Sequence, residues 1–424
     1  MTKVKNSIFN VSFSCGKNEY IYNSLSGALI KTDCSLFEII DDANARQSFV
    51  DKEIKLLMRK GFLVNDVIDE MGVLYQKTQK VIYSDNPDNI SYTVVLTNKC
   101  NCKCKYCFEQ ESAGRIDIDT DKTLEFIFRE LRKNPNLKTM NITWFGGEPL
   151  LNINAIETIS DKLLPYLDER KVRYEATIIT NGIMLNKLSC EFYKKYQIRH
   201  IQVTLDGTQN VYSEYKGVSA ERFSTVLNNL EQIGNMSERP SIGIRLNCDK
   251  HNVESLFELT DMLLIKGFDK FCSFYPAQIY TGSDSDLSDR EFFNFRMRYI
   301  RFLMEHGVID NLSKYLPKSR IGSCGYIQRG SYTIDSDGTL KKCERNVGDA
   351  NRVIGNVSNG LYYNDVERDF QRNDVLDQCM NCNIYPICRG GCKKMRMDGK
   401  SIDCSLAREE LIEMLKMIVE ERNA

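Results

Sequence analysis

The sequence predicts an α/β protein whose centre is an open, partial barrel of six β-α repeats. Two observations predict this fold. Between residues 91 and 275, short apolar runs alternate with amphipathic stretches, which is the pattern of parallel strands joined by right-handed helical crossovers. Most of the 16 cysteines fall in two groups, at 100–107 and 324–404. We therefore expect three domains, at 1–80, 90–310 and 311–424, with thiolate chemistry in the second and third.

The first 75 residues predict a small unit without clustered cysteines. Strands are expected at 7–13, 19–22 and 28–31, helices at 36–42 and 51–60, and a return strand at 62–64. This order resembles a winged-helix peptide-recognition domain, and residues 22–29 are similar to the hairpin of such domains. A structural cap on the barrel is the alternative. DNA binding is not expected, because a concentrated basic recognition helix is lacking. Residues 76–90 predict a polar linker.

The six repeats follow this linker in regular order. Strands are predicted at 92–96, 141–144, 173–179, 200–205, 242–246 and 270–274, and helices near 120–132, 153–167, 187–196, 220–233 and 252–265. Residues 286–316 are expected to be helical and to lead into the last domain. In such a barrel the functional loops lie at the C-terminal ends of the strands, and the motifs described next all follow a predicted strand.

The first motif is a C-x3-C-x2-C spacing formed by Cys100, Cys104 and Cys107. Three thiolates in one loop can hold three irons of a cubane and leave the fourth iron open, whereas electron-transfer [4Fe–4S] clusters use four cysteines. An all-thiolate zinc loop or a buried cysteine cluster is the alternative, but zinc loops usually pair C-x2-C units. Cys102 falls outside the spacing.

Together with Tyr106 and the later stretch at 145–149 (Phe-Gly-Gly-Glu-Pro), this spacing resembles the radical S-adenosylmethionine (radical SAM) enzymes over roughly residues 90–280. The resemblance implies a partial (β/α)6 radical SAM barrel and a [4Fe–4S] cluster whose open iron is chelated by S-adenosyl-L-methionine. It also implies one-electron cleavage of that cofactor and hydrogen abstraction from a substrate.

The resemblance further implies a set of cofactor-binding residues at the strand ends. They are Gly146, Gly147, Glu148, Pro149, Asn181, Thr204, Asp206, Arg245 and Asn247. Glu148 is the expected carboxylate partner of the SAM amino group. Thr204 stands where the family has serine in its Ser-x-Asp-Gly segment. For Arg245 and Asn247, a buried structural role is an equal alternative.

A second cysteine group follows residue 320 and resembles the SPASM domain, an auxiliary iron–sulfur domain of peptide-modifying radical SAM enzymes. Its Cys-x-Gly-Gly-Cys form is matched at 388–392, and a β-hairpin is expected at 331–342. Paired zinc knuckles are the alternative. The resemblance assigns a distal cluster to Cys379, Cys382, Cys388 and Cys404, and an inner cluster to Cys324, Cys343 and Cys392. The inner cluster then has an open iron or recruits a distant group such as Cys272.

Composition and charge exclude several classes of function. The formal net charge is −1, so no strong field favours nucleic acid. The start of the chain does not resemble a signal peptide, and no apolar run has the length of a membrane span. We therefore expect a cytoplasmic protein with reduced thiols. Only 3 histidines are present, which disfavours imidazole metal sites.

Together, the resemblances to radical SAM, SPASM and winged-helix peptide-recognition domains imply an enzyme that modifies a ribosomally synthesised peptide. Its leader is expected to bind the N-terminal domain as an added strand. The first expectation is a Cys-to-carbon thioether of sactipeptide or ranthipeptide type, with the open inner iron holding the substrate thiolate. Carbon–carbon or carbon–oxygen cross-linking and formylglycine formation in sulfatases are the alternatives. Glu344 follows Cys343 directly, and the resemblance to sulfatase-maturing enzymes makes it the candidate catalytic base, with a solvated surface glutamate as an equal alternative. A flavodoxin or ferredoxin is the expected reductant. A multi-cluster electron carrier or a SAM-binding regulator is the non-enzyme alternative.

Overall fold

A computed structural model describes residues 3–32, 51–109, 116–322, 324–372 and 375–423. The predicted helix at 36–42 lies outside these residues. The chain forms two compact units, and each contains segments that are distant in sequence. The barrel unit contains residues 85–299 and 328–371. The terminal unit contains residues 1–84, 300–327 and 372–424. This grouping in space differs from the three linear domains expected from the sequence, whose boundaries remain a prediction.

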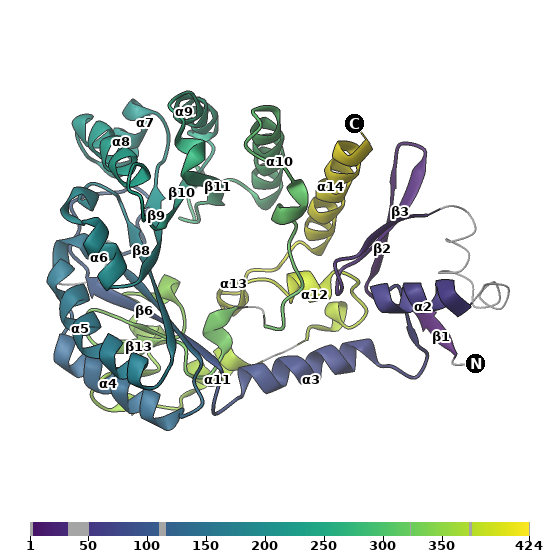
Figure 1. Ribbon diagram of the computed structural model, residues 1–424, viewed down its shortest axis with the longest axis horizontal. Helices are drawn as coiled ribbons and strands as arrows, with labels where there is room; N and C mark the ends of the chain where they lie inside the picture. Colours follow the sequence, from purple (N-terminus) through teal and green to yellow (C-terminus); the bar gives the residue numbers. More distant parts are fainter. Residues whose placement is uncertain (1–2, 33–50, 110–115, 323, 373–374, 424) are drawn as a thin grey trace. The chain divides into compact units, whose positions relative to one another are not determined.

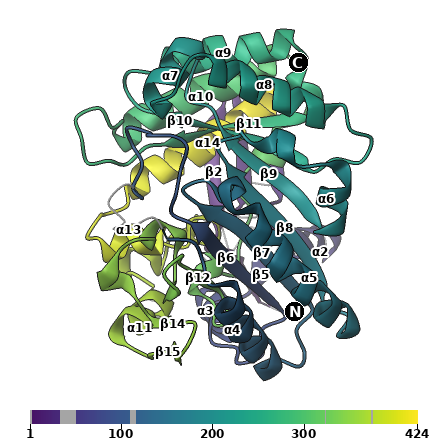
Figure 2. The ribbon, with the colours of Figure 1, turned by 90° about the vertical axis from the view of Figure 1, so that its left-hand side faces the viewer.

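The six predicted repeats are present in the barrel unit as successive parallel strands. They are β6 (Asn89–Thr97), β7 (Thr139–Gly146), β8 (Arg173–Thr180), β9 (Ile198–Thr204), β10 (Ser241–Cys248) and β11 (Cys272–Gln278). The connecting helices are α4 (Thr120–Lys133), α5 (Ile153–Glu169), α6 (Cys190–Lys195), α7 (Gln209–Lys216), α8 (Glu221–Gly234) and α9 (Val253–Ile265). They lie along the outer face of the curved sheet (Figure 2). The predicted fold class is therefore confirmed, although α7 was not expected.

Side-chain periodicity explains these elements. Along β7 and β8, every second residue is buried and the residues between are half-buried or exposed, as in a strand with one face in the core. Trp144 on β7 is fully buried. Asp119 caps α4 by accepting a hydrogen bond from the Lys122 N–H. The apolar side of α4 then packs on the sheet, where Phe126 lies 6.4 Å from Tyr92 of β6 between ring centroids.

The predicted hairpin at 331–342 is present, but it extends the barrel sheet. Its first strand, β12 (Tyr332–Ile334), pairs in parallel with β6, and β13 (Thr339–Lys341) returns antiparallel to it. Two short strands, β14 (Gly355–Asn356) and β15 (Gly360–Leu361), complete a ten-stranded sheet. Helix α11 (Asp365–Gln371) follows them. A segment that the sequence assigned to the last domain thus becomes part of the barrel unit.

The terminal unit is built from both ends of the chain. Its N-terminal part has β2 (Asn10–Cys15), β3 (Asn18–Asn23) and β4 (Leu29–Thr32) in an antiparallel sheet, and β1 (Val4–Asn6) paired with β5 (Leu63–Asn65). Its helices are α2 (Asp51–Lys60), α3 (Glu70–Ile82), α12 (Tyr385–Cys388), α13 (Lys393–Met397) and α14 (Cys404–Asn423). Figure 1 shows the labelled strand β2 and helix α14 of this unit. Val11 and Phe13 of β2 share a core with Leu411 and Leu415 of α14.

Two predictions for this unit need correction. Pairing of the strand expected at 7–13 begins at Asn10, because Ser7 and Asn10 form a turn in which the Asn10 N–H donates to the Ser7 carbonyl. Residues 76–82 are the second half of α3 and not a linker. Leu74, Thr78 and Ile82, spaced four residues apart, are buried, which gives this polar-looking stretch a helical packing face.

Helix α10 (Asp289–Glu305) lies within the predicted helical region at 286–316 and continues from the barrel unit into the terminal unit. Within the described ranges, none of the helices combines the length and the apolar character that crossing a bilayer requires.

Candidate active site

The site residues predicted at the strand ends lie at one edge of the barrel sheet. Because β6 to β10 are parallel, their C-terminal ends meet there. The cysteine loop follows β6, residues 146–149 span the end of β7 and the turn after it, and Asn181 follows β8. Thr204 ends β9, Asp206 comes shortly after it, and Arg245 and Asn247 are on β10.

The cysteine loop presents its thiols to hydrogen-bond donors. Cys100 is exposed, whereas Cys104 and Cys107 are half-buried. Cys100 Sγ accepts a hydrogen bond from the Cys102 N–H at 3.4 Å and lies 4.0 Å from Asn181 Nδ2. Donors of this kind favour a thiolate over a thiol. Burial raises the pKa of Cys107 to about 11, and negative charge on the nearby Cys104 and Cys100 adds to this effect.

The donor set fits an iron–sulfur cluster better than a single metal ion. Within the part of the chain that the structure describes, no three Cys, His, Asp or Glu side chains converge on one metal position. In a cubane each cysteine thiolate binds a different iron, so the cysteine sulfurs lie farther apart than when they share one metal ion.

Helix α7 holds the cysteine loop at its C-terminal end. The Lys103 N–H donates to the Lys216 carbonyl (2.8 Å), and the Lys105 N–H donates to the Tyr215 carbonyl (3.0 Å). These bonds satisfy carbonyls that a helix end leaves unpaired. Gly217 ends the helix with a φ of 60°, and a Cβ there would lie 2.9 Å from the Lys103 carbonyl oxygen. The loop thus docks on a helix that the sequence did not predict.

Glu148 is fully buried and joins the ends of two strands. Its Oε1 accepts hydrogen bonds from the Thr180 hydroxyl (2.7 Å) and the Leu150 N–H (3.0 Å), and its Oε2 accepts one from the Asn181 N–H (2.8 Å). Burial raises the pKa of Glu148, and these donors partly oppose the rise. The carboxylate therefore fixes Asn181, whose amide faces the cysteine loop.

Asp206 is also fully buried, and its described contacts are with protein side chains. Its carboxylate accepts hydrogen bonds from the Tyr106 hydroxyl at 2.8 and 2.9 Å and pairs with Lys216 Nζ at 3.1 Å. Neither Lys216 nor the hydroxyl of Tyr106 was singled out from the sequence. A lysine that precedes a helix-ending glycine is common on surfaces, so the sequence carried no signal that Lys216 is buried.

The predicted polar residues on β10 lie next to the end of strand β9. Arg245 Nε donates to Asn247 Oδ1 at 2.8 Å, and Arg245 is in register with Thr204 of β9. Asn252, which the sequence analysis missed, donates to the carbonyls of Asp206 (2.9 Å) and Asn247 (2.8 Å). It therefore fixes the ends of β9 and β10 relative to each other.

Comparison with known proteins identifies this arrangement. Residues 94–277, which include the cysteine loop and the strand ends just described, match the radical SAM superfamily. The chain contains a radical SAM domain. Enzymes of this superfamily bind S-adenosylmethionine and a [4Fe–4S] cluster, and the chain is accordingly a radical SAM enzyme.

Relatives of this radical SAM enzyme match most of its length at low identity. It is 22% identical to the radical SAM cyclopropyl synthase TigE of Paramaledivibacter caminithermalis, covering 88% of this chain and 85% of the relative. It is 23% identical to a cysteine-type anaerobic sulfatase-maturating enzyme of Clostridium novyi, covering 70% and 86%.

Solved structures share the fold. The protein anSMEcpe with bound AdoMet aligns with a TM-score of 0.61 at 17% identity, covering 79% of this chain and 99% of that one. Streptococcus suis SuiB bound to its precursor peptide SuiA aligns with a TM-score of 0.52 at 17% identity, covering 94% and 97%.

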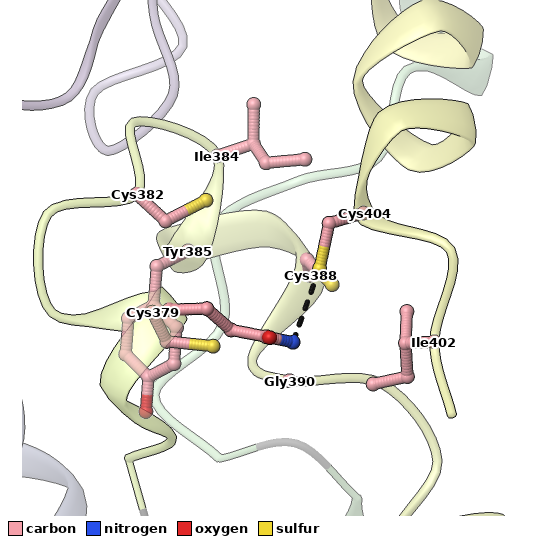
Figure 3. A pocket seen from close by; sticks show the side chains of 9 residues that line it. Cys379, Cys382, Ile384, Tyr385, Cys388, Gly390, Ile402 and Cys404 are labelled. Carbon is pink, nitrogen blue, oxygen red and sulfur yellow. Dashed lines mark hydrogen bonds between the residues drawn. The ribbon is translucent and has the colours of Figure 1, made fainter. Parts of the chain in front are cut away.

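Outside the radical SAM domain, the terminal unit brings together four further cysteines. Cys379, Cys382, Cys388 and Cys404 line one pocket with apolar neighbours that include Ile384 and Ile402, and their sulfurs face its interior (Figure 3). Burial, together with negative charge on the other three cysteines, raises the pKa of Cys379 to about 11. Four thiols around one small space could hold a cluster, whereas the described side chains do not converge on a single zinc position.

The remaining predicted residues are divided between the two units. Cys324 and Cys392 belong to the terminal unit, and Cys343 and Glu344 belong to the barrel unit. Cys343 is buried, and Glu344 begins a short 3-10 helix. Cys272 is buried at the first residue of β11, so it lies at the sheet edge opposite the radical SAM loop.

Gly146 offers a direct test of the close packing at this edge. Its φ is 130°, and a Cβ would lie 2.2 Å from the Thr97 carbonyl oxygen, so Gly146→Ala must separate the ends of β6 and β7. The matched control is Gly282→Ala, with a φ of 80° but open space around it. Because both glycines have a positive φ, each alanine variant should lose about 1–2 kcal/mol of folding stability. Overpacking against the Thr97 carbonyl should cost Gly146→Ala about 1–3 kcal/mol more. Denaturant unfolding would show this difference, and equal losses would contradict it.

Proposed function

We propose that this radical SAM enzyme modifies a ribosomally synthesised precursor peptide by hydrogen abstraction. The observation that carries the proposal is the presence, in one chain, of a three-thiol loop at the barrel edge and a separate four-thiol pocket. The likeness to SuiB, which was solved with a precursor peptide, supports a peptide substrate.

Cys100, Cys104 and Cys107 would hold the [4Fe–4S] cluster and leave one iron for S-adenosylmethionine. Cluster and cofactor together supply one-electron cleavage of the sulfonium and hydrogen abstraction. The protein would hold the loop through α7 and the strand ends through Glu148 and Asn252. The proposed cofactor contacts lie on or just after the C-terminal halves of strands at the same edge: Gly146, Gly147, Glu148, Pro149, Asn181, Thr204, Asp206, Arg245 and Asn247.

The cysteines between residues 324 and 404 would carry auxiliary clusters. Cys379, Cys382, Cys388 and Cys404 would hold the distal cluster. Cys324, Cys343 and Cys392 would hold an inner cluster with an open iron, which could bind a substrate thiolate and keep its sulfur beside the carbon to be attacked. On this basis we propose a Cys-to-carbon thioether as the product, with Glu344 as a base.

The leader of the precursor would bind the N-terminal sheet as an added strand. In the described residues the sheet order is β2-β3-β4, so β4 offers main-chain donors and acceptors at an edge. Edge pairing recognises an extended peptide with little demand on its sequence. A flavodoxin or ferredoxin would supply electrons in the cytoplasm.

A carbon–carbon bond within the peptide is the second candidate. The similarity to TigE, a cyclopropyl synthase, extends over most of both chains and favours it.

Mass spectrometry of a candidate precursor, after anaerobic incubation with reconstituted enzyme, S-adenosylmethionine and reductant, tests the proposal. A peptide that has lost two hydrogens and whose cysteine thiols no longer react with an alkylating reagent supports a thioether. A peptide with the same mass loss whose thiols all still react supports a carbon–carbon or carbon–oxygen bond. An aldehyde at a cysteine would indicate formylglycine formation. Cofactor cleavage with unchanged peptide would contradict the choice of substrate, and absence of 5′-deoxyadenosine would favour an electron carrier.

A further inference from the structure

Lys216 is a buried cation next to the cysteine loop. Its side chain is only 4% exposed, and the Asp206 side chain opposite it is 0% exposed. Lys216 Nζ lies 3.1 Å from Asp206 Oδ2 and donates to the Tyr106 hydroxyl at 2.9 Å. The ammonium also lies over the Tyr106 ring, 5.5 Å from its centroid. Tyr106 precedes Cys107 directly, so one end of this network is part of the cysteine loop.

The backbone joins Lys216 to the same loop a second time. Its carbonyl accepts the Lys103 N–H at 2.8 Å, one residue before Cys104. The preceding residue, Tyr215, accepts the Lys105 N–H and donates its own hydroxyl to Asp249 Oδ1 at 2.7 Å. Lys216 is therefore held in a fixed position relative to Cys104 by both its side chain and its main chain.

The Lys216 ammonium faces the buried Asp206 carboxylate, which favours its charged form. Burial alone would lower the pKa of Lys216, but Asp206, Tyr106 and Cys104 together raise it well above its ordinary value. A positive charge in a site of low dielectric acts strongly on nearby charges.

A purely structural account of Lys216 is weak on energetic grounds. Taking two charges out of water costs more than a well-packed apolar pair would, so a buried ion pair is poor evidence of a stabilising role. The hydrogen bonds between Tyr106 and Asp206 do not need a cation. Placing a lysine there nevertheless puts a permanent positive charge beside a thiolate.

We propose that Lys216 is a positioning residue that fixes the cysteine loop and, through its buried charge, makes the radical SAM cluster easier to reduce. The inference rests on the proposed cluster ligands Cys100, Cys104 and Cys107. Reduction adds one negative charge to the cluster, and a nearby cation stabilises the reduced form more than the oxidised form. Charge and hydrogen bonding are among the factors that set the potentials of such clusters.

Redox titration followed by electron paramagnetic resonance, on the full-length reconstituted enzyme, tests this charge effect. The signal that changes when S-adenosylmethionine is added identifies the radical SAM cluster among the others. For Lys216→Met we expect a more negative reduction potential, and for Lys216→Arg a value closer to wild type. Asp206→Asn should shift the potential in the opposite direction, because the lysine charge is then no longer partly cancelled.

Tyr106→Phe is the matched control, since it removes the hydroxyl that both charged groups contact but keeps both charges. Its potential should stay near wild type, and a shift as large as that of Lys216→Met would overturn the proposal. An unchanged potential in Lys216→Met would do the same. If Lys216→Met does not bind its cluster, Asp206→Asn provides the test. A less negative reduction potential in Asp206→Asn supports the proposal, and an unchanged potential overturns it. A wild-type enzyme without a SAM-responsive signal would instead contradict the proposed function.

Discussion

Replacing Cys104 by serine should reduce 5′-deoxyadenosine formation to the level seen without enzyme. A serine hydroxyl does not ionise near neutral pH, so the loop would offer two thiolates where three irons must be held. Loss of the radical SAM cluster should lower the iron content by about four atoms per chain. The measurement is anaerobic turnover of S-adenosylmethionine together with iron and sulfide analysis.

The matched control is Cys190→Ser on α6, outside the site. The Cys190 thiol donates to the Glu238 carbonyl at 3.1 Å, and a serine hydroxyl can donate in the same way. This variant should keep the iron content and turnover of wild type. Retention of deoxyadenosine formation in Cys104→Ser, with the control unchanged, would show that Cys104 is not a cluster ligand.

The barrel could be predicted from the sequence because its signals are local. Each strand is a short apolar run, and each helix has a periodic apolar face, so strand and helix follow from patterns within about ten residues. Parallel pairing then places the end of every strand at one edge. The positions of Glu148, Asn181 and Asp206 at that edge followed from this rule alone.

The roles of the same side chains could not be predicted, because they depend on contacts between distant residues. Glu148 bonds groups around residue 180, and Asp206 bonds Tyr106, a hundred residues earlier. Lys216 looks like an ordinary surface lysine in the sequence. Its burial follows only from the docking of α7 against the cysteine loop.

The terminal unit also contains contacts between distant residues that local sequence patterns do not indicate. Arg389 lies between Cys388 and Cys392 and donates hydrogen bonds to the Thr78 hydroxyl and to the Ile321 carbonyl. Thr78 belongs to α3, in a stretch that looked like a linker, and Ile321 lies three residues before Cys324. One buried arginine thus connects three segments that the sequence assigned to separate elements.

Replacing Glu148 by alanine should destabilise the barrel unit by at least about 3 kcal/mol. Three donors, from Leu150, Thr180 and Asn181, would lose their acceptor in a fully buried space, and each unsatisfied buried group costs about 1–3 kcal/mol. The matched variant is Glu148→Gln. Its amide oxygen can still accept from Thr180 and Leu150, but its NH2 group faces the Asn181 N–H.

The glutamine variant should lose less stability, about 1–3 kcal/mol, because it also removes a carboxylate whose charge burial disfavours. The midpoint of denaturant unfolding of the cluster-free protein measures both losses, and S-adenosylmethionine binding to the reconstituted enzyme reports whether Asn181 has moved. We expect binding to weaken in both variants, and more in Glu148→Ala. Unfolding midpoints equal to wild type in both would show that the three hydrogen bonds do not support the strand ends, and Glu148 would then act through the cofactor alone.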